Sequence, residues 1–278
     1  DVGLKIGETA FGESSTKDAV LPDYELRWFD RWFKGIDDEG VFEAPAKYFI
    51  MGGGEGSRDS AGLFQHGGQW GTSESWPPEE VEMAPYYLRP AGLLSREAPQ
   101  HDDAITTFRC DPSDPAPSST GVCYTVTRLE GGTKRINTNG AWDQREGNHL
   151  WFSQDPKLPL TARHDVVLFQ TEPLEKDLEI TGHPIVELWF STDGADADFV
   201  AKLVDVYPPS ADDPDGFALA VSEGIQRAKF RDGFENPSLL VPGQVYHLRV
   251  EMRPLSNLFK KGHRLRVDIT GSSFPHFD

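Results

Sequence analysis

Alternation of apolar and polar residues with a period of two is the feature that most restricts the fold of this chain. It is clearest in residues 245–252, where Tyr246, Leu248, Val250 and Met252 alternate with His247, Arg249 and Glu251. Residues 264–269 repeat the pattern, and we expect one set to face inward (Leu265, Val267, Ile269) and the other outward (Arg264, Arg266, Asp268). A period of two places alternate side chains on opposite faces of a strand, so both segments are predicted to be half-buried β-strands.

Other short apolar runs lie between turn residues, and no helical pattern alternates with them. The segments 185–190 and 199–206 are apolar on both faces, as in a central strand, and further candidates are residues 48–51, 86–89, 105–108, 151–153 and 166–169. The 27 Gly and 21 Pro residues favour many turns. The sequence therefore predicts a mainly β fold: antiparallel sheets in a jelly-roll β-sandwich over residues 46–278.

One amphipathic helix is predicted over residues 21–35, in a separate N-terminal region that comprises residues 1–45. Large apolar residues recur there at helical spacing: Leu21, Tyr24, Trp28 and Trp32, with Phe29 and Phe33 beside them. Pro22 suits the first turn and Gly35 suits the C-terminal cap. So many aromatic side chains require a large apolar surface to pack against, and the segment 36–46 is the expected boundary.

Charge and composition exclude several classes of function. The formal net charge of −18 argues against nucleic acid, because a phosphate backbone requires a Lys/Arg surface. No apolar run approaches the roughly 18 residues that span a bilayer, so we expect no membrane partner. The Asp-rich turns 193–198 and 212–216 lack the ligand spacing of a calcium loop. We therefore predict no metal and no cofactor.

Two cysteines, Cys110 and Cys123, flank a Pro-rich stretch. A disulfide between them would close a short loop and contribute about 3 kcal/mol. Two free thiols are an equal alternative, because the cellular compartment decides and the sequence leaves localisation open between cytoplasmic and secreted. No histidine lies at ligand spacing beside them, which disfavours zinc.

The motifs of hydrolytic and nucleotide chemistry are missing. Ser14, Ser73 and Ser273 each follow a Gly by two positions, but none is followed by the second Gly of a G-x-S-x-G nucleophile elbow. There is no H-E-x-x-H, P-loop or G-x-G-x-x-G motif. We therefore expect no catalytic residue in this stretch, and the residues alone indicate only an acidic β-sandwich.

Several phrases, in order along the chain, resemble the C-terminal part of the cocaine esterase-like (CocE/NonD) family of serine hydrolases. They are L-R-W-F-D-R-W-F-K-G (26–35), Y-F-I-M-G-G-G (48–54), W-P-P (76–78), Y-Y-L-R (86–89), D-P-S-D-P-A-P-S (111–118), D-A-D-F-V-A-K-L-V-D-V (196–206), G-I-Q-R-A-K-F-R (224–231) and G-H-R-L-R-V-D-I-T-G-S-S-F-P (262–275). The last three are similar to a jelly-roll signature shared with X-Pro dipeptidyl-peptidases. The resemblance implies that the helix is the last helix of an α/β-hydrolase domain.

The resemblance also implies an activity: hydrolysis of ester or amide bonds, including X-Pro peptide bonds, by a Ser-Asp-His triad. All three triad residues are expected upstream of Asp1, and the family's closing segment after S-F-P-x-F-D is not present here. In the family, the loop after the Pro-rich phrase approaches the active site, which corresponds to residues 118–125. Cys123 and Tyr124 are the first candidates for substrate contact, although they could equally pack the sandwich. Trp70 and Trp76 are the second candidates, because a Trp in a loop can line a pocket but more often anchors the loop.

Expected partners are a small ester, amide or short peptide substrate, the hydrolase domain, and a second copy in a homo-oligomer. An alternative is a carbohydrate- or ligand-binding jelly-roll module without catalysis of its own, with exposed Trp and Tyr as stacking platforms. A third reading is structural, in which the sandwich docks on a hydrolase domain and completes an oligomer. A G-x-S-x-G and a G-x-W-x-H phrase upstream of Asp1 would decide for the enzyme.

Overall fold

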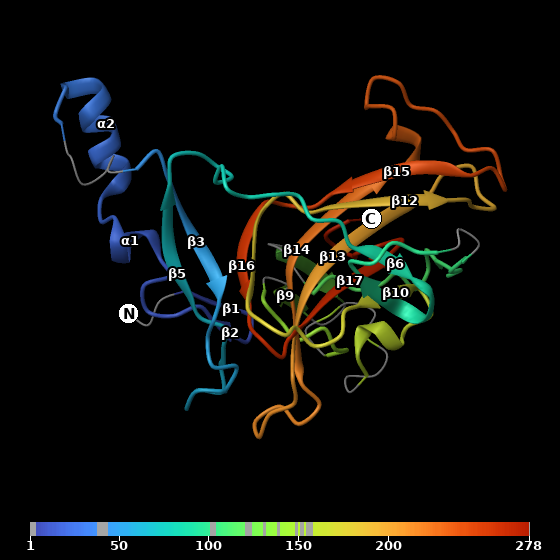
Figure 1. Cartoon of the computed structure of the whole chain (residues 1–278), viewed down its shortest axis with the longest axis horizontal. Helices are drawn as coiled ribbons and strands as arrows, with labels where there is room; N and C mark the ends of the chain where they lie inside the picture. Colours follow the sequence, from blue (N-terminus) through green and yellow to red (C-terminus); the bar gives the residue numbers. More distant parts are fainter. Residues whose placement is uncertain are drawn as a thin grey trace.

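A computed structural model describes residues 4–37, 44–100, 104–119, 124–129, 132–137, 140–147, 150, 153 and 158–277 (Figure 1). Its strands are β1 (Lys5–Ile6), β2 (Thr9–Ala10), β3 (Ala46–Gly52), β4 (Phe64–Gln65), β5 (Gly68–Ser73), β6 (Tyr87–Arg89), β7 (Leu93–Ser95), β8 (Tyr124–Leu129), β9 (Gly132–Asn137), β10 (Val166–Gln170), β11 (Leu178–Gly182), β12 (Ile185–Phe190), β13 (Asp198–Tyr207), β14 (Phe217–Arg227), β15 (Tyr246–Glu251), β16 (Leu255–Phe259) and β17 (Arg264–Thr270). The α-helices are α1 (Lys17–Val20) and α2 (Tyr24–Lys34), and single 3-10 turns lie at 90–92, 160–162 and 228–230.

The sandwich is built from a six-stranded sheet that faces shorter sheets. The six-stranded sheet has the order β14-β13-β17-β10-β7-β6, and the sheets opposite are β11-β16-β3-β5 and the pair β12-β15. Most neighbours are antiparallel, as predicted; the short pairings β7–β10, β3–β16 and β2–β4 are parallel. The fold is therefore mainly β with the predicted sandwich architecture.

The apolar core lies between the sheets and confirms the predicted inward faces. Leu248 and Val250 of β15 are buried there, together with Leu265, Val267 and Ile269 of β17. The strand β13 lies between β14 and β17 and is buried almost throughout, as a strand covered on both faces should be.

The predicted outward face of β17 is a correction. Arg266 and Asp268 alternate with the core residues of β17, but both are buried. Ala116, Pro117, Gln144 and Leu160 lie over the outer face of the sheet at Asp268. Alternation shows which face of a strand is apolar. It does not show whether distant segments of the chain cover the other face.

A second correction concerns residues 105–108, which form no strand, and Ile105 is exposed. Phe108 nevertheless packs edge-on against Phe199 of the core, with ring centroids 6.4 Å apart. Of the predicted strand 151–153, residues 151 and 152 lie outside the described part of the chain.

The predicted helix forms as α2, shorter than expected at its start. Pro22 lies before the helix, which begins after Asp23 in the left-handed region (φ 55°). Gly35 ends it with φ 69°, and its N–H donates to the carbonyl oxygen of Arg31 at 3.1 Å. The helix projects away from the sheets, at the opposite end of the molecule from β12 and β15 (Figure 1), and none of its residues is buried.

Residues before the predicted boundary at 45 also touch the sandwich. Phe11 packs in a second core cluster with Phe64, Tyr207 and Phe217. Arg58 links this region by ion pairs to Glu8 and Asp213, at 3.1 and 2.8 Å. The N-terminal segment is thus anchored to the sandwich, whereas α2 stands free of it; the domain boundary itself stays a prediction.

Candidate functional site

The Pro-rich segment 111–119, here called the strap, crosses the outer face of the six-stranded sheet. Its hydrogen bonds run to the segment after β17: Phe274 N–H donates to the carbonyl of Ala116 (2.9 Å), and Ser118 N–H donates to the carbonyl of Phe274 (2.7 Å). Ser119 Oγ donates to Gln144 Oε1 at 2.8 Å. Ser118 and Ser119 are fully buried, so the strap is fixed directly before residues 120–123.

Arg163 binds the start of the strap at Asp114. Arg163 donates to both carboxylate oxygens of Asp165 at 2.8 and 3.0 Å, and to the carbonyl oxygen of Asp114 at 2.8 Å. Glu146 lies 3.8 Å from the same guanidinium, and the side chains of Arg163, Asp165 and Glu146 are all buried. A planar guanidinium suits this arrangement because it can form two parallel bonds with a carboxylate and still donate elsewhere.

Three charged side chains lie in register across neighbouring strands of the same face. Lys202 of β13 pairs with Glu223 of β14 and Asp268 of β17, and all three are buried. Burial alone would raise the pKa of Glu223, but the positive charge of Lys202, together with the nearby His276 and Ser273, holds this pKa below its usual value. In the sequence this group shows only as a lysine within an apolar strand, a pattern that predicts no particular role.

The first-rank candidates lie next to the strap in sequence. Tyr124 is the first residue of β8, which pairs with β9 in the register Tyr124↔Asn137. Cys123 lies outside the described residues. Burial raises the pKa of the Cys110 thiol. Its predicted disulfide partner Cys123 lies outside the described residues, so the disulfide stays a prediction.

The second-rank candidates lie elsewhere, on and just after β5. The indole N–H of Trp70 donates to the carbonyl oxygen of Ser14 at 2.7 Å, and its ring meets Phe49 edge-on. Trp76 meets Tyr48 edge-on, with ring centroids 4.9 Å apart. Both indoles thus anchor the N-terminal segment and the four-stranded sheet, and their described contacts do not bring them together with the strap.

None of the three serines considered in the sequence is arranged as a nucleophile. Ser273 is fully buried, Ser73 Oγ donates to the carbonyl of Ser75, and Ser14 offers its carbonyl to Trp70. Among the described residues, no group of three or more His, Cys, Asp or Glu side chains could hold a metal ion. Within the same residues, no helix has the length and apolar character needed to cross a membrane.

Residues 41–278 match the family described as the X-Pro dipeptidyl-peptidase C-terminal non-catalytic domain. The chain belongs to this family, the C-terminal domain of CocE/NonD hydrolases.

Named relatives are hydrolases of larger size. The chain is 30% identical over 261 residues to a cocaine esterase of Rhodococcus sp. (strain MB1 Bresler), covering 90% of this chain and 38% of the relative. An α-amino acid ester hydrolase structure matches with TM-score 0.67 and 28% identity, covering 98% of this chain and 40% of that one. An aminopeptidase structure from a marine sediment archaeon, Thaumarchaeota archaeon, matches with TM-score 0.70 and 25% identity, covering 99% and 40%. The chain thus spans about two fifths of the length of these relatives.

Proposed function

We propose that this chain is the C-terminal part of a serine hydrolase that cleaves ester or amide bonds in small acyl or short peptide substrates. The relatives named above are an esterase, an ester hydrolase and an aminopeptidase, which supports this bond class. The chain matches only 38–40% of their lengths, which leaves room in a longer protein for a separate catalytic domain.

In this proposal the catalytic triad lies outside the chain. A serine attacks the acyl carbon, a histidine acts as general base and then as general acid, and an aspartate orients the histidine, so that the reaction passes through an acyl-enzyme. The family's description as non-catalytic is consistent with this division of labour, as is the burial of Ser273.

The contribution of this domain is a wall of the substrate pocket formed by residues 118–125. The observation that supports this assignment is the fixation of the strap by Arg163, Phe274 and Gln144 as far as Ser119, at the start of that segment. A loop that contacts substrate gains from a rigid base, because a small displacement at a reacting centre lowers the rate strongly.

The helix α2 supplies the second contact, with the hydrolase domain. Trp32 is 63% and Phe33 80% exposed in this chain, although both are large apolar side chains. Exposed apolar clusters of this kind mark interaction surfaces. A helix continuous in sequence with the preceding domain is well placed to pack on it.

The intact reading frame and an activity assay test the proposal together. We expect a G-x-S-x-G and a G-x-W-x-H phrase upstream of Asp1, hydrolysis of p-nitrophenyl acetate by the full protein, and loss of that activity when the elbow serine is changed to alanine. The 278-residue chain alone should show no turnover above buffer and no labelling by a fluorophosphonate probe. Stoichiometric labelling of Ser14, Ser73 or Ser273 would contradict the assignment of the triad.

One observation favours the alternative of a binding module. Trp189 of β12 is 71% exposed, and its ring lies beside His247 of β15 with centroids 4.8 Å apart. An exposed indole on a sheet face can stack on the apolar face of a sugar ring. Saturable quenching of tryptophan fluorescence by an oligosaccharide, abolished in Trp189→Ala and retained in Trp70→Ala, would support this function; no quenching would remove it.

A further inference from the structure

His276 lies between an arginine and a buried carboxylate, each beside one of its ring nitrogens. Nη2 of Arg253 lies 3.1 Å from His276 Nε2, and Oε1 of Glu223 lies 3.8 Å from His276 Nδ1. A guanidinium can only donate, so Nε2 accepts and the ring proton is on Nδ1, the nitrogen beside Glu223. The imidazole is therefore neutral, and its one N–H lies next to a carboxylate whose side chain is 4% exposed.

Glu223 and Arg253 belong to a firmly bonded part of the sandwich. Glu223 is in β14, which pairs with β13 in an antiparallel register. The N–H of Arg253 donates to the carbonyl oxygen of Glu223 at 3.1 Å, and the hydroxyl of Ser222 donates to the carbonyl oxygen of Arg253 at 2.6 Å. The two groups beside the imidazole are thus fixed to each other through the backbone.

The imidazole belongs to a turn, residues 273–277, that follows β17. The N–H of Phe277 donates to the carbonyl oxygen of Ser273 at 2.8 Å and closes the turn. The rings of His276 and Phe277 are stacked, with centroids 4.2 Å apart. Through its two nitrogens His276 therefore ties this turn to β14 and to Arg253.

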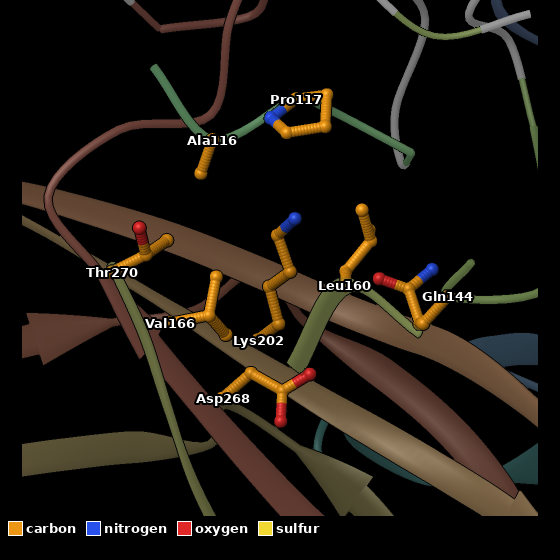
Figure 2. Close-up of a pocket in the computed structure, with 8 residues that line it drawn as sticks. All are labelled: Ala116, Pro117, Gln144, Leu160, Val166, Lys202, Asp268 and Thr270. Carbon is orange, nitrogen blue, oxygen red and sulfur yellow. The ribbon is translucent and has the colours of Figure 1, made fainter. Parts of the chain in front are cut away.

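The same turn holds the strap against the outer face of the six-stranded sheet. The N–H of Phe274 donates to the carbonyl oxygen of Ala116 at 2.9 Å, and the N–H of Ser118 donates to the carbonyl oxygen of Phe274 at 2.7 Å. Ala116 and Pro117 line one small pocket together with Lys202 of β13 (Figure 2), so this part of the strap lies on the sheet. A displacement of Phe274 would reach Ser118, where the segment 118–125 begins.

The N–H of His276 matters because it lies beside a buried carboxylate that is incompletely bonded. Neither carboxylate oxygen of Glu223 has a hydrogen-bond partner in the described part of the chain, although Lys202 is its register partner on β13. An apolar ring in place of the imidazole would deprive this buried charge of a nearby N–H dipole. The change would favour a position of the turn further from β14, and Phe274 would move with the turn.

We propose that His276 is a positioning residue for the wall of the substrate pocket: it fixes the turn 273–277 on Arg253 and Glu223, and through Phe274 it fixes the strap. This inference rests on the proposed function, in which residues 118–125 form that wall. His276 does not contact the substrate in this account; it acts through the strap.

Two variants of the full-length protein separate the ring nitrogens from the shape of the ring. His276→Phe keeps an aromatic ring beside Phe277 and removes both nitrogens. His276→Gln has no ring, but its amide can accept from Arg253 and donate toward Glu223. If the nitrogens fix the turn, the glutamine variant should resemble the unmodified protein more closely than the phenylalanine variant does.

The control is another buried histidine. His66 is bonded to Tyr207 and Asn257, and neither partner belongs to the turn or to the strap. His66→Gln therefore reports what a general loss of stability does to exchange and to kinetics.

Hydrogen exchange, followed by mass spectrometry on peptides from residues 111–119 and 272–277, measures whether the strap loosens. We expect His276→Phe to speed exchange in both peptides about fivefold or more, because the local opening costs less free energy. His276→Gln should recover at least about half of this change, and His66→Gln should alter exchange in these peptides less than about twofold.

Hydrolysis of p-nitrophenyl acetate separates positioning from general instability. In His276→Phe we expect KM to rise about threefold or more while kcat changes less than about twofold, because a loosened wall weakens the binding of substrate and transition state alike and leaves the triad intact. His276→Gln should lie between this variant and the unmodified protein, and His66→Gln should keep the original KM.

Unchanged exchange of the strap in His276→Phe would overturn the inference, and so would faster exchange with an unchanged KM. Equal effects of the phenylalanine and glutamine variants would show that the ring nitrogens are not what fixes the turn. If His276→Phe does not fold, Arg253→Met, at an exposed residue, removes the donor to Nε2 and should change exchange and KM in the same directions. If the unmodified full-length protein hydrolyses no ester, the proposed function fails, and exchange alone then decides whether His276 holds the strap.

Discussion

Nε2 of His66 lies 2.9 Å from the side-chain oxygen of Asn257, in a fully buried part of the sandwich. Asn257 Nδ2 points to Asp205 Oδ2 at 3.4 Å, so its oxygen faces the imidazole and Nε2 must carry the proton. Nδ1 of His66 then accepts from the hydroxyl of Tyr207 at 2.6 Å. Asp205 also accepts from His263 Nδ1 at 2.8 Å. The neutral imidazole is therefore fully bonded, and burial lowers the pKa of His66.

This arrangement predicts a loss of stability in mild acid. Because the pKa of His66 is lowered on folding, the unfolded chain binds a proton near pH 6.5 while the folded chain does not. The free energy of unfolding should therefore fall as the pH drops below about 6.5, by up to about 1.4 kcal/mol per pH unit. Urea unfolding between pH 7.5 and about 5 measures this slope.

His66→Gln is the variant that isolates this contribution. It should be less stable at neutral pH, by about 1–3 kcal/mol, because Tyr207 and Asn257 lose their partner. Its stability should also depend less on pH than that of the unmodified chain. His164→Gln, at an exposed histidine, serves as the control and should keep the original slope. An unchanged slope in His66→Gln would assign the acid sensitivity to other groups.

Removing the charge of Arg163 should lower the stability of the fold strongly, because this side chain binds buried carboxylates. Arg163→Met leaves the buried carboxylate of Asp165 without the cation that it binds here, which should lower the free energy of unfolding by about 3–5 kcal/mol. Lys34→Ala removes an exposed i,i+4 ion pair with Asp30 and should change stability by no more than about 0.5 kcal/mol. Equal effects of the two variants in urea unfolding would contradict the buried role of Arg163.

Two glycines are required for different physical reasons. A Cβ at Gly224 would lie 2.1 Å from the carbonyl oxygen of Glu251 in β15, so Gly224→Ala forces two packed strands apart. Gly262 has open space around it but a φ of 88°, so Gly262→Ala introduces only backbone strain. We expect a cost of about 3 kcal/mol or more for Gly224→Ala and about 1–3 kcal/mol for Gly262→Ala. The reverse order in thermal unfolding would contradict this comparison.

Local patterns predicted the strands and α2 because these depend on neighbouring residues. The alternation in β15 and β17 indicated the inward faces of both strands, and helical spacing of aromatic residues indicated α2. The resemblance to a family supplied the order of these elements and the class of the protein, which periodicity alone left open.

What could not be predicted depends on contacts distant in sequence. Arg266 and Asp268 alternate with apolar residues as solvent-exposed side chains do, yet both are buried, and a strap some 150 residues away in sequence lies over Asp268. The sequence around Lys202 likewise does not show that Ala116 and Pro117, distant in sequence, lie beside this lysine. The sequence leaves open whether Trp70 lines a pocket or, as is commoner, anchors a loop; its indole N–H donates to Ser14, 56 residues away in sequence. The roles of Tyr124 and of residues 120–123, which lie outside the described part of the chain, stay predictions.

The aromatic residues of α2 carry the last prediction. Trp28 and Trp32 lie with ring centroids 6.0 Å apart, and Phe29 and Phe33 are stacked at 5.7 Å, so the pairs form a ridge along the helix. In this chain the ridge is exposed, and Trp32→Ala should change stability by no more than about 0.5 kcal/mol. The same exposure should make the chain bind a hydrophobic dye and self-associate, and Trp32→Ala should weaken both effects.

The full-length protein should respond in the opposite way. If α2 packs on the hydrolase domain, Trp32→Ala removes a buried indole and should cost about 3–5 kcal/mol through lost transfer energy and the cavity left behind. Lys34→Ala, two residues away on the same helix, should have little effect in either protein. The contrast between the two contexts is what tests the docking, because a change of helix propensity would appear in both. If the isolated chain is monomeric by light scattering and binds no dye, the ridge has no need of a partner and the docking proposal is wrong.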